Sequence, residues 1–176
     1  MLVIDASVAI AACHTPVGFA RFRGHEIVAP QLMIVEASSV FHEMSWRGAI
    51  SKQRAKQMLT RLLKADIEIR TPNGLIEAAW DVAGELGWAK TYDAQYVALA
   101  QMLDCNLVSI DERLLRGIAR LGIAVRPREL LTESDSAVAS RRHLCPVPTR
   151  PVETFPTRLP TRPCGQQPSS KSSNHR

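Results

Sequence analysis

The sequence predicts an α/β fold, a three-layer α/β/α sandwich in which helices cover both faces of a parallel sheet of about five strands. Two observations predict it. Short runs rich in β-branched residues alternate along the chain with longer segments of helical period. The short runs read as buried strands and not as strands that alternate apolar and polar residues, which favours a parallel sheet covered on both faces.

The expected elements alternate along the chain. Each strand is one of the short β-branched runs, and these runs are 2–5, 26–28, 67–69, 106–110 and 123–125. Each helix is one of the longer periodic segments, and these segments are 30–46, 51–64, 73–86, 92–103 and 112–121.

Residues that favour helix ends stand at the expected boundaries. Pro30 suits the first turn of its helix, and Ser51 and Asn73 are good N-caps. Glycines, which favour helix C-termini, close three of the segments: Gly48, Gly87 and Gly122. The boundary residues therefore agree with the periodicity.

The composition changes abruptly near Ser134. Seven of the eleven prolines lie between Pro146 and Pro168, and a Gln/Ser-rich end follows. Such a segment has too few large apolar side chains to offset the entropy cost of ordering it. The sequence predicts one folded domain over 1–133 and a disordered Pro/Ser/Arg-rich tail over 134–176.

The formal net charge of +5 belongs to the predicted tail. Residues 1–133 carry 15 Lys and Arg against 15 Asp and Glu, whereas residues 134–176 carry 7 against 2. Net charge is therefore no argument that the folded domain binds nucleic acid. A solvated extension is the simplest interpretation of the tail.

Several classes of protein are excluded or disfavoured. No apolar run approaches the ~18 residues of a membrane span, and the N-terminus lacks the basic segment of a signal peptide, so we expect a cytoplasmic protein without membrane association. Glycine-rich phosphate loops and the G-x-S-x-G elbow are absent. No cysteine pair has zinc or redox spacing, and Cys13 and Cys105 are expected to be buried free thiols.

Two carboxylates are expected at the ligand-binding edge of the sheet. Asp5 ends the first strand and Asp111 ends the fourth. Open parallel sheets bind ligands outside the carboxyl ends of their strands, where these side chains would stand. For either residue alone, the simpler interpretation is a helix N-cap.

Glu36 is harder to explain as a structural residue. It follows Met33 by three residues and precedes Val40 by four, within an apolar stripe that should face the core. A buried unpaired carboxylate is costly unless a cation, hydrogen-bond donors or solvent compensate it. No Lys or Arg lies three or four residues from Glu36, which excludes a local ion pair.

Asp93 is the fourth candidate. Thr91 is expected to cap the helix, which would place Asp93 in the first turn, where the helix dipole stabilises an anion by roughly 0.3–1 kcal/mol. This position alone explains the residue. Val97 and Ala100, however, continue its face as apolar, so the side chain is expected on the core side of its helix.

These four carboxylates require protons or a cation if they meet in one pocket. Two like charges about 4 Å apart repel by about 4 kcal/mol at an effective dielectric of 20. Oxygen-only ligands suit a hard ion, Mg²⁺ or Mn²⁺, which also recruits phosphate oxygens and so indicates phosphodiester chemistry. The candidate metal ligands are Asp5, Glu36, Asp93 and Asp111.

The segments that carry these acids resemble those of a known family. They are Val3-Ile4-Asp5-Ala6-Ser7, Pro30 with Glu36 on the following helix, Tyr92-Asp93-Ala94 leading into Tyr96-Val97-Ala98-Leu99-Ala100, and Leu107-Val108-Ser109-Ile110-Asp111 with Leu114. In this order, over about residues 1–131, they resemble the PIN-domain ribonucleases of the VapC toxin type. The resemblance implies the same α/β/α sandwich around a parallel sheet.

The resemblance also implies a function. The four acids would be the catalytic, metal-binding residues of a Mg²⁺-dependent endoribonuclease, the toxin of a type II toxin–antitoxin system. One or two Mg²⁺ ions would activate the attacking water. A cognate antitoxin protein, an RNA substrate and a homodimer are implied as partners. Two departures are visible: Ser109 stands where the family often has Thr, and the tail continues past Leu131, where such toxins usually end.

Neighbouring residues have expected supporting roles. Ser7 and Ser109 would orient a carboxylate or a metal-bound water, with helix capping an equal alternative for Ser7. Arg113, Arg116 and Arg120 fall at i, i+3 and i+7, so they would form a basic stripe that holds RNA phosphates. A solvated helix face is the alternative for this stripe.

A second class of function stays open at this point. The same fold could serve as a non-catalytic RNA- or protein-binding interaction module. A divalent-metal titration separates the two hypotheses, because a dication site raises the melting temperature by mass action. A phosphoacceptor domain is less favoured, since it requires paired acids after the first strand and Asp5 stands alone there.

Overall fold

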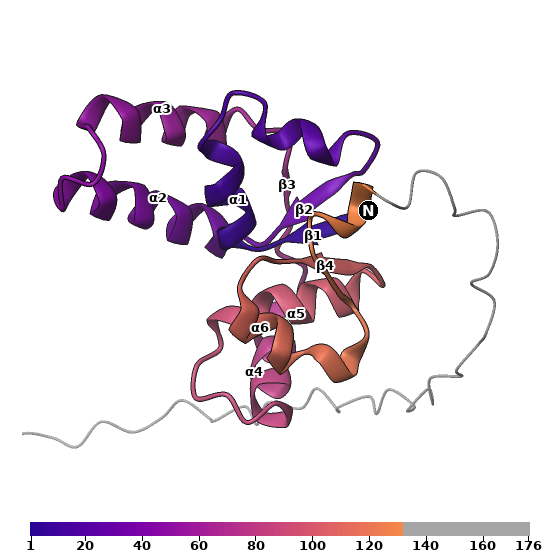
Figure 1. Cartoon of the computed structure of the whole chain (residues 1–176). Helices are drawn as coiled ribbons and strands as arrows, with labels where there is room; N and C mark the ends of the chain where they lie inside the picture. The colour runs from indigo at the N-terminus through magenta and orange to yellow at the C-terminus, as the bar shows by residue number, and fades with distance from the viewer. Residues whose placement is uncertain (132–176) are drawn as a thin grey trace, which may run out of the picture. The chain divides into compact units, whose positions relative to one another are not determined.

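Five parallel strands form the centre of the domain in the computed structural model, which describes residues 1–131 (Figure 1). The strands are β1 (Leu2–Ile4), β2 (Ile27–Ala29), β3 (Glu68–Ile69), β4 (Asn106–Val108) and β5 (Ala124–Val125). Their order across the sheet is β3-β2-β1-β4-β5, and every pairing is parallel.

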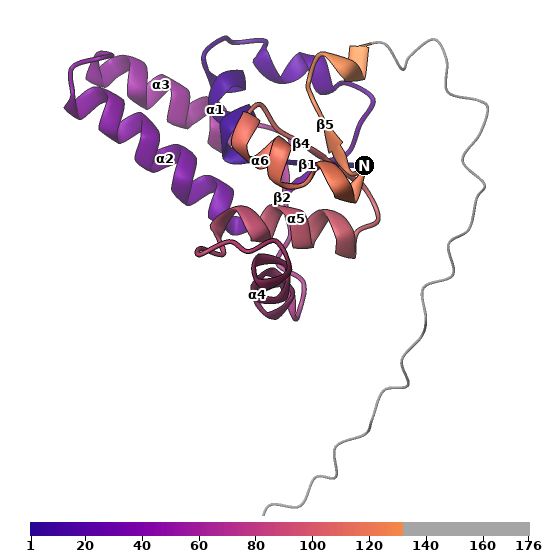
Figure 2. The same ribbon diagram turned by 60° about the horizontal axis from the view of Figure 1, so that its bottom comes forward.

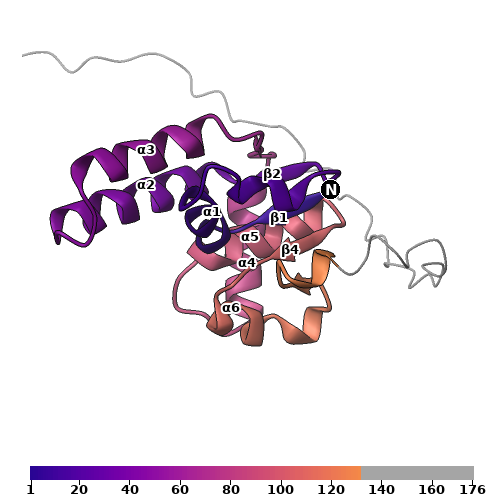
Figure 3. The ribbon, with the colours of Figure 1, turned by 45° about the horizontal axis from the view of Figure 1, so that its top comes forward.

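Helices cover both faces of this sheet. They are α1 (Ala6–Cys13), α2 (Gln31–Trp46), α3 (Lys52–Leu63), α4 (Leu75–Glu85), α5 (Tyr92–Met102) and α6 (Glu112–Gly117). Helices α1, α2 and α3 lie on one side, and α4, α5 and α6 lie on the other (Figures 1 and 2). Helices α2 and α3 run side by side and project beyond the sheet (Figure 3). The predicted α/β/α fold class is confirmed, whereas the predicted tail, 134–176, lies outside the described residues.

The core fixes the edge of the sheet at which the candidate acids stand. Strands β1 and β4 are fully buried at their centres, and α5 packs against both of them. The parallel register pairs Ile4 with Val108, so the residues that follow, Asp5 and Ser109, leave the sheet side by side. Helix α5 leads into β4 and runs back along the sheet, which places its N-terminus at the edge where the strands end.

Helix α1 is not among the predicted elements, and helix α6 is shorter than predicted. Helix α1 is missing from the predicted elements because five of its eight residues are buried, so that no polar face gives it a helical period. The predicted helix 112–121 is wrong in extent, since α6 ends at Gly117 and a separate 3-10 turn covers Ala119–Leu121. Gly117 is a weak helix former, and its missing side chain leaves room for the Trp88 indole.

The helix boundaries are confirmed in part. The Ser51 side chain accepts a hydrogen bond from the Arg54 amide, as an N-cap should. The three C-terminal glycines have φ angles of 74°, 68° and 68°. The N-cap of α4 is Gly74 and not Asn73, because the chain enters this helix through a left-handed residue with φ of 81°.

Two further expectations concern cysteines and membranes. Cys13 is a buried free thiol, as predicted, and Cys105 is free but only partly buried. Within residues 1–131, no helix has the length and apolar character that crossing a bilayer requires.

Gly18 is expected to be essential for packing between the end of α1 and the turn that follows it. A Cβ atom at this position would lie 1.9 Å from the Ala12 carbonyl oxygen, and backbone atoms cannot move aside as a flexible side chain can. Gly18→Ala should therefore lower the free energy of unfolding by about 1–3 kcal/mol, measured by urea denaturation of the full chain.

Gly84→Ala is the matched control for this substitution. Gly84 lies within α4, and nothing stands within 4 Å of an added Cβ atom. This change should raise the free energy of unfolding by up to about 1 kcal/mol, because alanine favours the helix. A Gly18→Ala protein as stable as wild type would contradict the packing described here.

Candidate active site

Asp5 is a buried carboxylate at the junction between β1 and α1. The residue is 4% exposed. Its Oδ1 accepts a hydrogen bond from the Val8 amide at 2.9 Å, which makes Asp5 the N-cap of α1. The Ser7 hydroxyl lies 2.7 and 2.9 Å from the two carboxylate oxygens, and the Ser109 hydroxyl donates to Oδ2 at 2.6 Å. Burial raises the pKa of Asp5, and these hydrogen bonds oppose the rise.

The hydroxyls of Ser7 and Ser109 connect the two turns that leave the sheet. Ser109 is fully buried, and its oxygen also accepts a hydrogen bond from the Asp111 amide at 2.9 Å. The Ser7 oxygen accepts from the Ile110 amide at 3.3 Å. Each hydroxyl therefore binds Asp5 and the backbone after β4, which is the geometry expected of a residue that orients a carboxylate.

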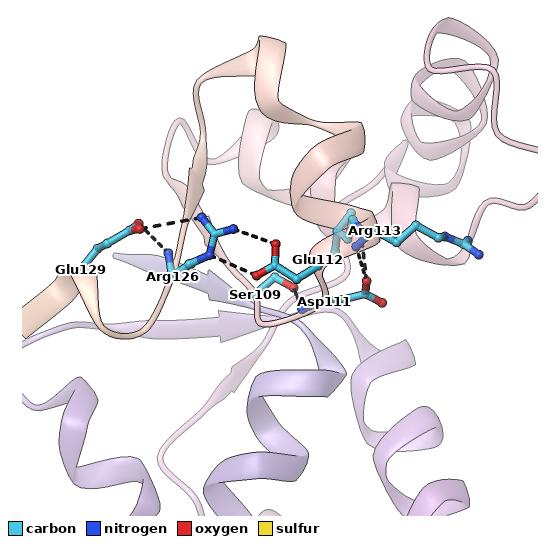
Figure 4. Close-up of polar contacts among 7 residues, drawn as sticks. Ser109, Asp111, Glu112, Arg113, Arg126 and Glu129 are labelled. Carbon is cyan, nitrogen blue, oxygen red and sulfur yellow. Dashed lines mark hydrogen bonds and ion pairs between the residues drawn. The ribbon is translucent and has the colours of Figure 1, made fainter.

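Asp111 begins α6 and caps it. Its Oδ1 accepts hydrogen bonds from the amides of Arg113, at 2.7 Å, and Leu114, at 3.2 Å (Figure 4). The simpler interpretation, an N-cap, thus describes the structural role of Asp111 as it does that of Asp5. Asp111 is exposed, and within residues 1–131 its second carboxylate oxygen has no hydrogen-bond donor, so this oxygen is available to a ligand.

Glu36 is held by a tyrosine. It is partly buried on α2, and its Oε2 accepts a hydrogen bond of 2.5 Å from the phenol of Tyr96 on α5. Burial raises the pKa of Glu36, the Tyr96 hydrogen bond opposes the rise, and repulsion from Asp93 and Asp5 adds to it. No ion pair reaches Glu36 from any other part of residues 1–131.

Tyr96 was not among the site residues expected from the sequence. It is 1% exposed and stands in an apolar run, so it reads as an ordinary core residue. Its spacing in the sequence could identify it as a site residue, because Tyr96 follows Asp93 by three residues and must lie on the same face of the helix. Burial and the neighbouring Glu36 raise the pKa of the Tyr96 phenol, which keeps it a proton donor to the carboxylate.

Asp93 lies in the first turn of α5, at the edge where the strands end. Its Oδ2 is 3.5 Å from Nη2 of Arg113, and its side chain is 36% exposed. Burial raises the pKa of Asp93, Arg113 opposes the rise, and Asp111 adds to it by repulsion. Thr91 precedes the helix as predicted, but its side chain makes no capping hydrogen bond.

The four acids repel one another in pairs, although no three of them lie close enough together to hold a metal ion. In addition to burial, repulsion from Asp111 raises the pKa of Asp5 and of Asp93, and repulsion from Asp93 and Asp5 raises the pKa of Glu36. A hollow of about 540 Å³ is lined by two of these acids, Glu36 and Asp93, and by Arg113, Gly87, Trp88, Ala89, Lys90 and Tyr92. Asp5 and Asp111 do not line this hollow.

The candidate metal ligands are all carboxylates. Across residues 1–131, no group of three or more His, Cys, Asp or Glu side chains is gathered closely enough to hold a metal ion as it stands. Mg²⁺ does not require such a group, because it is usually bound by one or two carboxylates and completes its shell with waters and phosphate oxygens. Oxygen-only donors with pKa values raised by burial and mutual repulsion fit a hard dication.

The predicted basic stripe is interrupted. Arg113 and Arg116 lie on α6, but Arg120 belongs to the 3-10 turn that follows Gly117. Arg120 also donates a hydrogen bond of 2.8 Å to the Glu85 carbonyl. The three arginines therefore do not share one helix face, and Arg120 has a structural role.

Known proteins resemble this chain in sequence and in fold. The PIN domain family matches residues 2–121. The chain is 37% identical over 134 residues to the VapC ribonuclease Mb0985 of Mycobacterium bovis and to Ribonuclease VapC9 of Mycobacterium tuberculosis, which covers 73% of this chain and 100% of each relative. The crystal structure of PAE2754 from Pyrobaculum aerophilum has the same fold, with a TM-score of 0.62 at 23% identity over 77% of this chain and 95% of that one. The chain therefore belongs to the PIN-domain family, among the VapC-type ribonucleases.

Proposed function

We propose that this protein is a Mg²⁺-dependent endoribonuclease and the toxin of a type II toxin–antitoxin pair. The observation that carries the proposal is the placement of the carboxylates: Glu36 and Asp93 line one hollow, and burial raises the pKa values of both and of Asp5. Desolvated acids that repel one another cost stability, and such groups are typical of functional sites. The ribonuclease relatives supply the class of reaction.

Each residue would have a distinct role in hydrolysis. When bound, Mg²⁺, or Mn²⁺ in its place, supplies Lewis acidity for activating water and neutralising the phosphate. Residues Ser7 and Ser109 would hold the Asp5 carboxylate in one orientation, and Tyr96 would do the same for Glu36. The acids that would hold one or two such ions, directly or through bound water, are Asp5, Glu36, Asp93 and Asp111.

The toxin role implies protein partners. A cognate antitoxin would bind and silence the enzyme, and we retain the homodimer as a proposal. Two apolar side chains on one exposed face of α4 support a protein contact, because Ile76 is 58% exposed and Trp80, four residues later, is 71% exposed.

The interaction module is the second candidate function. It is favoured by one observation, namely that Asp5 and Asp111 already have structural roles as N-caps. A module of this kind would bind RNA or protein without cutting, so RNA cleavage by the purified chain separates the two hypotheses.

Asp5→Asn and Asp93→Asn should each reduce cleavage of a fluorescent single-stranded RNA at least about 100-fold while the protein stays folded. Asparagine caps a helix as well as aspartate does, so loss of the α1 cap does not explain a loss of activity in Asp5→Asn. Asp81→Asn, an exposed substitution on α4, is the control and should cleave normally. Wild-type rates in both site variants would refute the catalytic role.

Mg²⁺ should raise the melting temperature of the full chain, and more at pH 7 than at pH 5. An acid whose pKa is raised on folding keeps its proton to higher pH in the folded state, so its contribution to stability falls as pH rises through the raised pKa. This applies to Asp5, Glu36 and Asp93 without metal. At pH 7 fewer protons compete with the dication. Calorimetry in EDTA and in Mg²⁺ at both pH values tests this, and a larger Mg²⁺ effect at pH 5 is the contrary result.

Tyr96→Phe should lower kcat about 10- to 100-fold with little change in KM for RNA. The substitution removes only the hydroxyl that donates to Glu36, and a hydrogen bond to a charged group contributes about 1.5–3 kcal/mol. Tyr92→Phe is the matched control, since the Tyr92 residue is 54% exposed and its hydroxyl makes no hydrogen bond within residues 1–131. Equal kcat values for the two variants would show that Tyr96 does not position Glu36.

A further inference from the structure

Arg113 contacts the carboxylates of two candidate acids with different parts of the residue. Its backbone N–H donates to Asp111 at 2.7 Å, which fixes its position at the start of α6. Its side chain leaves Asp111, as Figure 4 shows, and its Nη2 lies 3.5 Å from Asp93. The backbone bond therefore holds the guanidinium within reach of Asp93.

The contact between Arg113 and Asp93 is loose and open to solvent. The Arg113 side chain is 83% exposed, and 3.5 Å is longer than a strong charge-assisted hydrogen bond. Both residues line the hollow that Glu36 also lines. Among the ion pairs within residues 1–131, this is the one that involves any of the four acids.

We propose that Arg113 is a built-in counter-ion that neutralises Asp93 in the metal-free protein and gives way when a divalent cation binds. This inference rests on the proposed function, because it requires a dication at the acids. The guanidinium and the dication compete for the same carboxylate, so each weakens the binding of the other by the same factor. The released guanidinium is then free to bind a phosphate of the RNA substrate, whose oxygens fit its planar fork of donors.

The size of the competition follows from the exposure of the pair. Exposed ion pairs are weak, so Arg113 should reduce Mg²⁺ affinity only about two- to fivefold. Removing the guanidinium should tighten Mg²⁺ binding by this factor. It should also weaken RNA binding when Mg²⁺ is saturating, because the phosphate loses its partner. A purely structural ion pair would produce neither change.

Calorimetric titration of the full chain with Mg²⁺ tests the exchange, using wild type, Arg113→Gln and Arg116→Gln. Arg116 is the matched control, because it lies on the same exposed helix one turn later, and its substitution removes the same charge without touching any of the four acids. We expect Mg²⁺ affinity to rise about two- to fivefold in Arg113→Gln alone. Equal affinities in the two variants would overturn the exchange.

A second readout separates this inference from the proposed function. At saturating Mg²⁺, Arg113→Gln should raise KM for RNA severalfold, whereas Arg23→Gln, an exposed substitution before β2 and so at the opposite edge of the sheet, should leave it close to wild type. An unchanged KM in Arg113→Gln would overturn the release of the guanidinium to substrate. Failure of the wild-type protein to bind Mg²⁺ at all would instead overturn the proposed metal-dependent function, whatever the variants do.

Discussion

The buried carboxylate of Asp5 sets the arrangement of the active edge. The carboxylate is only 4% exposed and must be compensated, and within residues 1–131 hydrogen-bond donors do so: the Val8 amide and the hydroxyls of Ser7 and Ser109. Ser109 reaches Asp5 only because β1 and β4 are neighbours in parallel register. The same pairing that closes the core therefore builds the site, and a shift in register would leave a buried charge without its donor.

The remaining acids are compensated in three different ways. Glu36 accepts a hydrogen bond from the Tyr96 phenol, and Asp93 faces the loosely held guanidinium of Arg113. Asp111 accepts hydrogen bonds from backbone amides. Helix α5 connects these arrangements, since it carries Asp93 and Tyr96 on one face and packs against the two central strands. The hydrogen-bonded acids are held in place, whereas the one faced by an exposed arginine can exchange its partner. This division fits a site that must keep its geometry while a cation binds.

The sheet and the candidate acids can be predicted from the sequence because both follow from local rules. Buried strands lack a polar face, and residues that follow neighbouring parallel strands lie side by side, as Asp5 and Ser109 do. The role of Tyr96 cannot be predicted from the sequence, because this residue resembles any core residue. The contact between Arg113 and Asp93 cannot be predicted either, because it depends on how α5 and α6 pack. Helix α1 was missed since a helix that is apolar on most sides has no period.

Manganese-soaked crystals of the full chain would test the central claim most directly, because Mn²⁺ replaces Mg²⁺ and can be located by its anomalous scattering. The account predicts a peak about 2 Å from carboxylate oxygens of Asp5 or Asp93, with the Arg113 guanidinium displaced from Asp93. A saturating soak that leaves these carboxylates without a peak, with Arg113 still on Asp93, would contradict it.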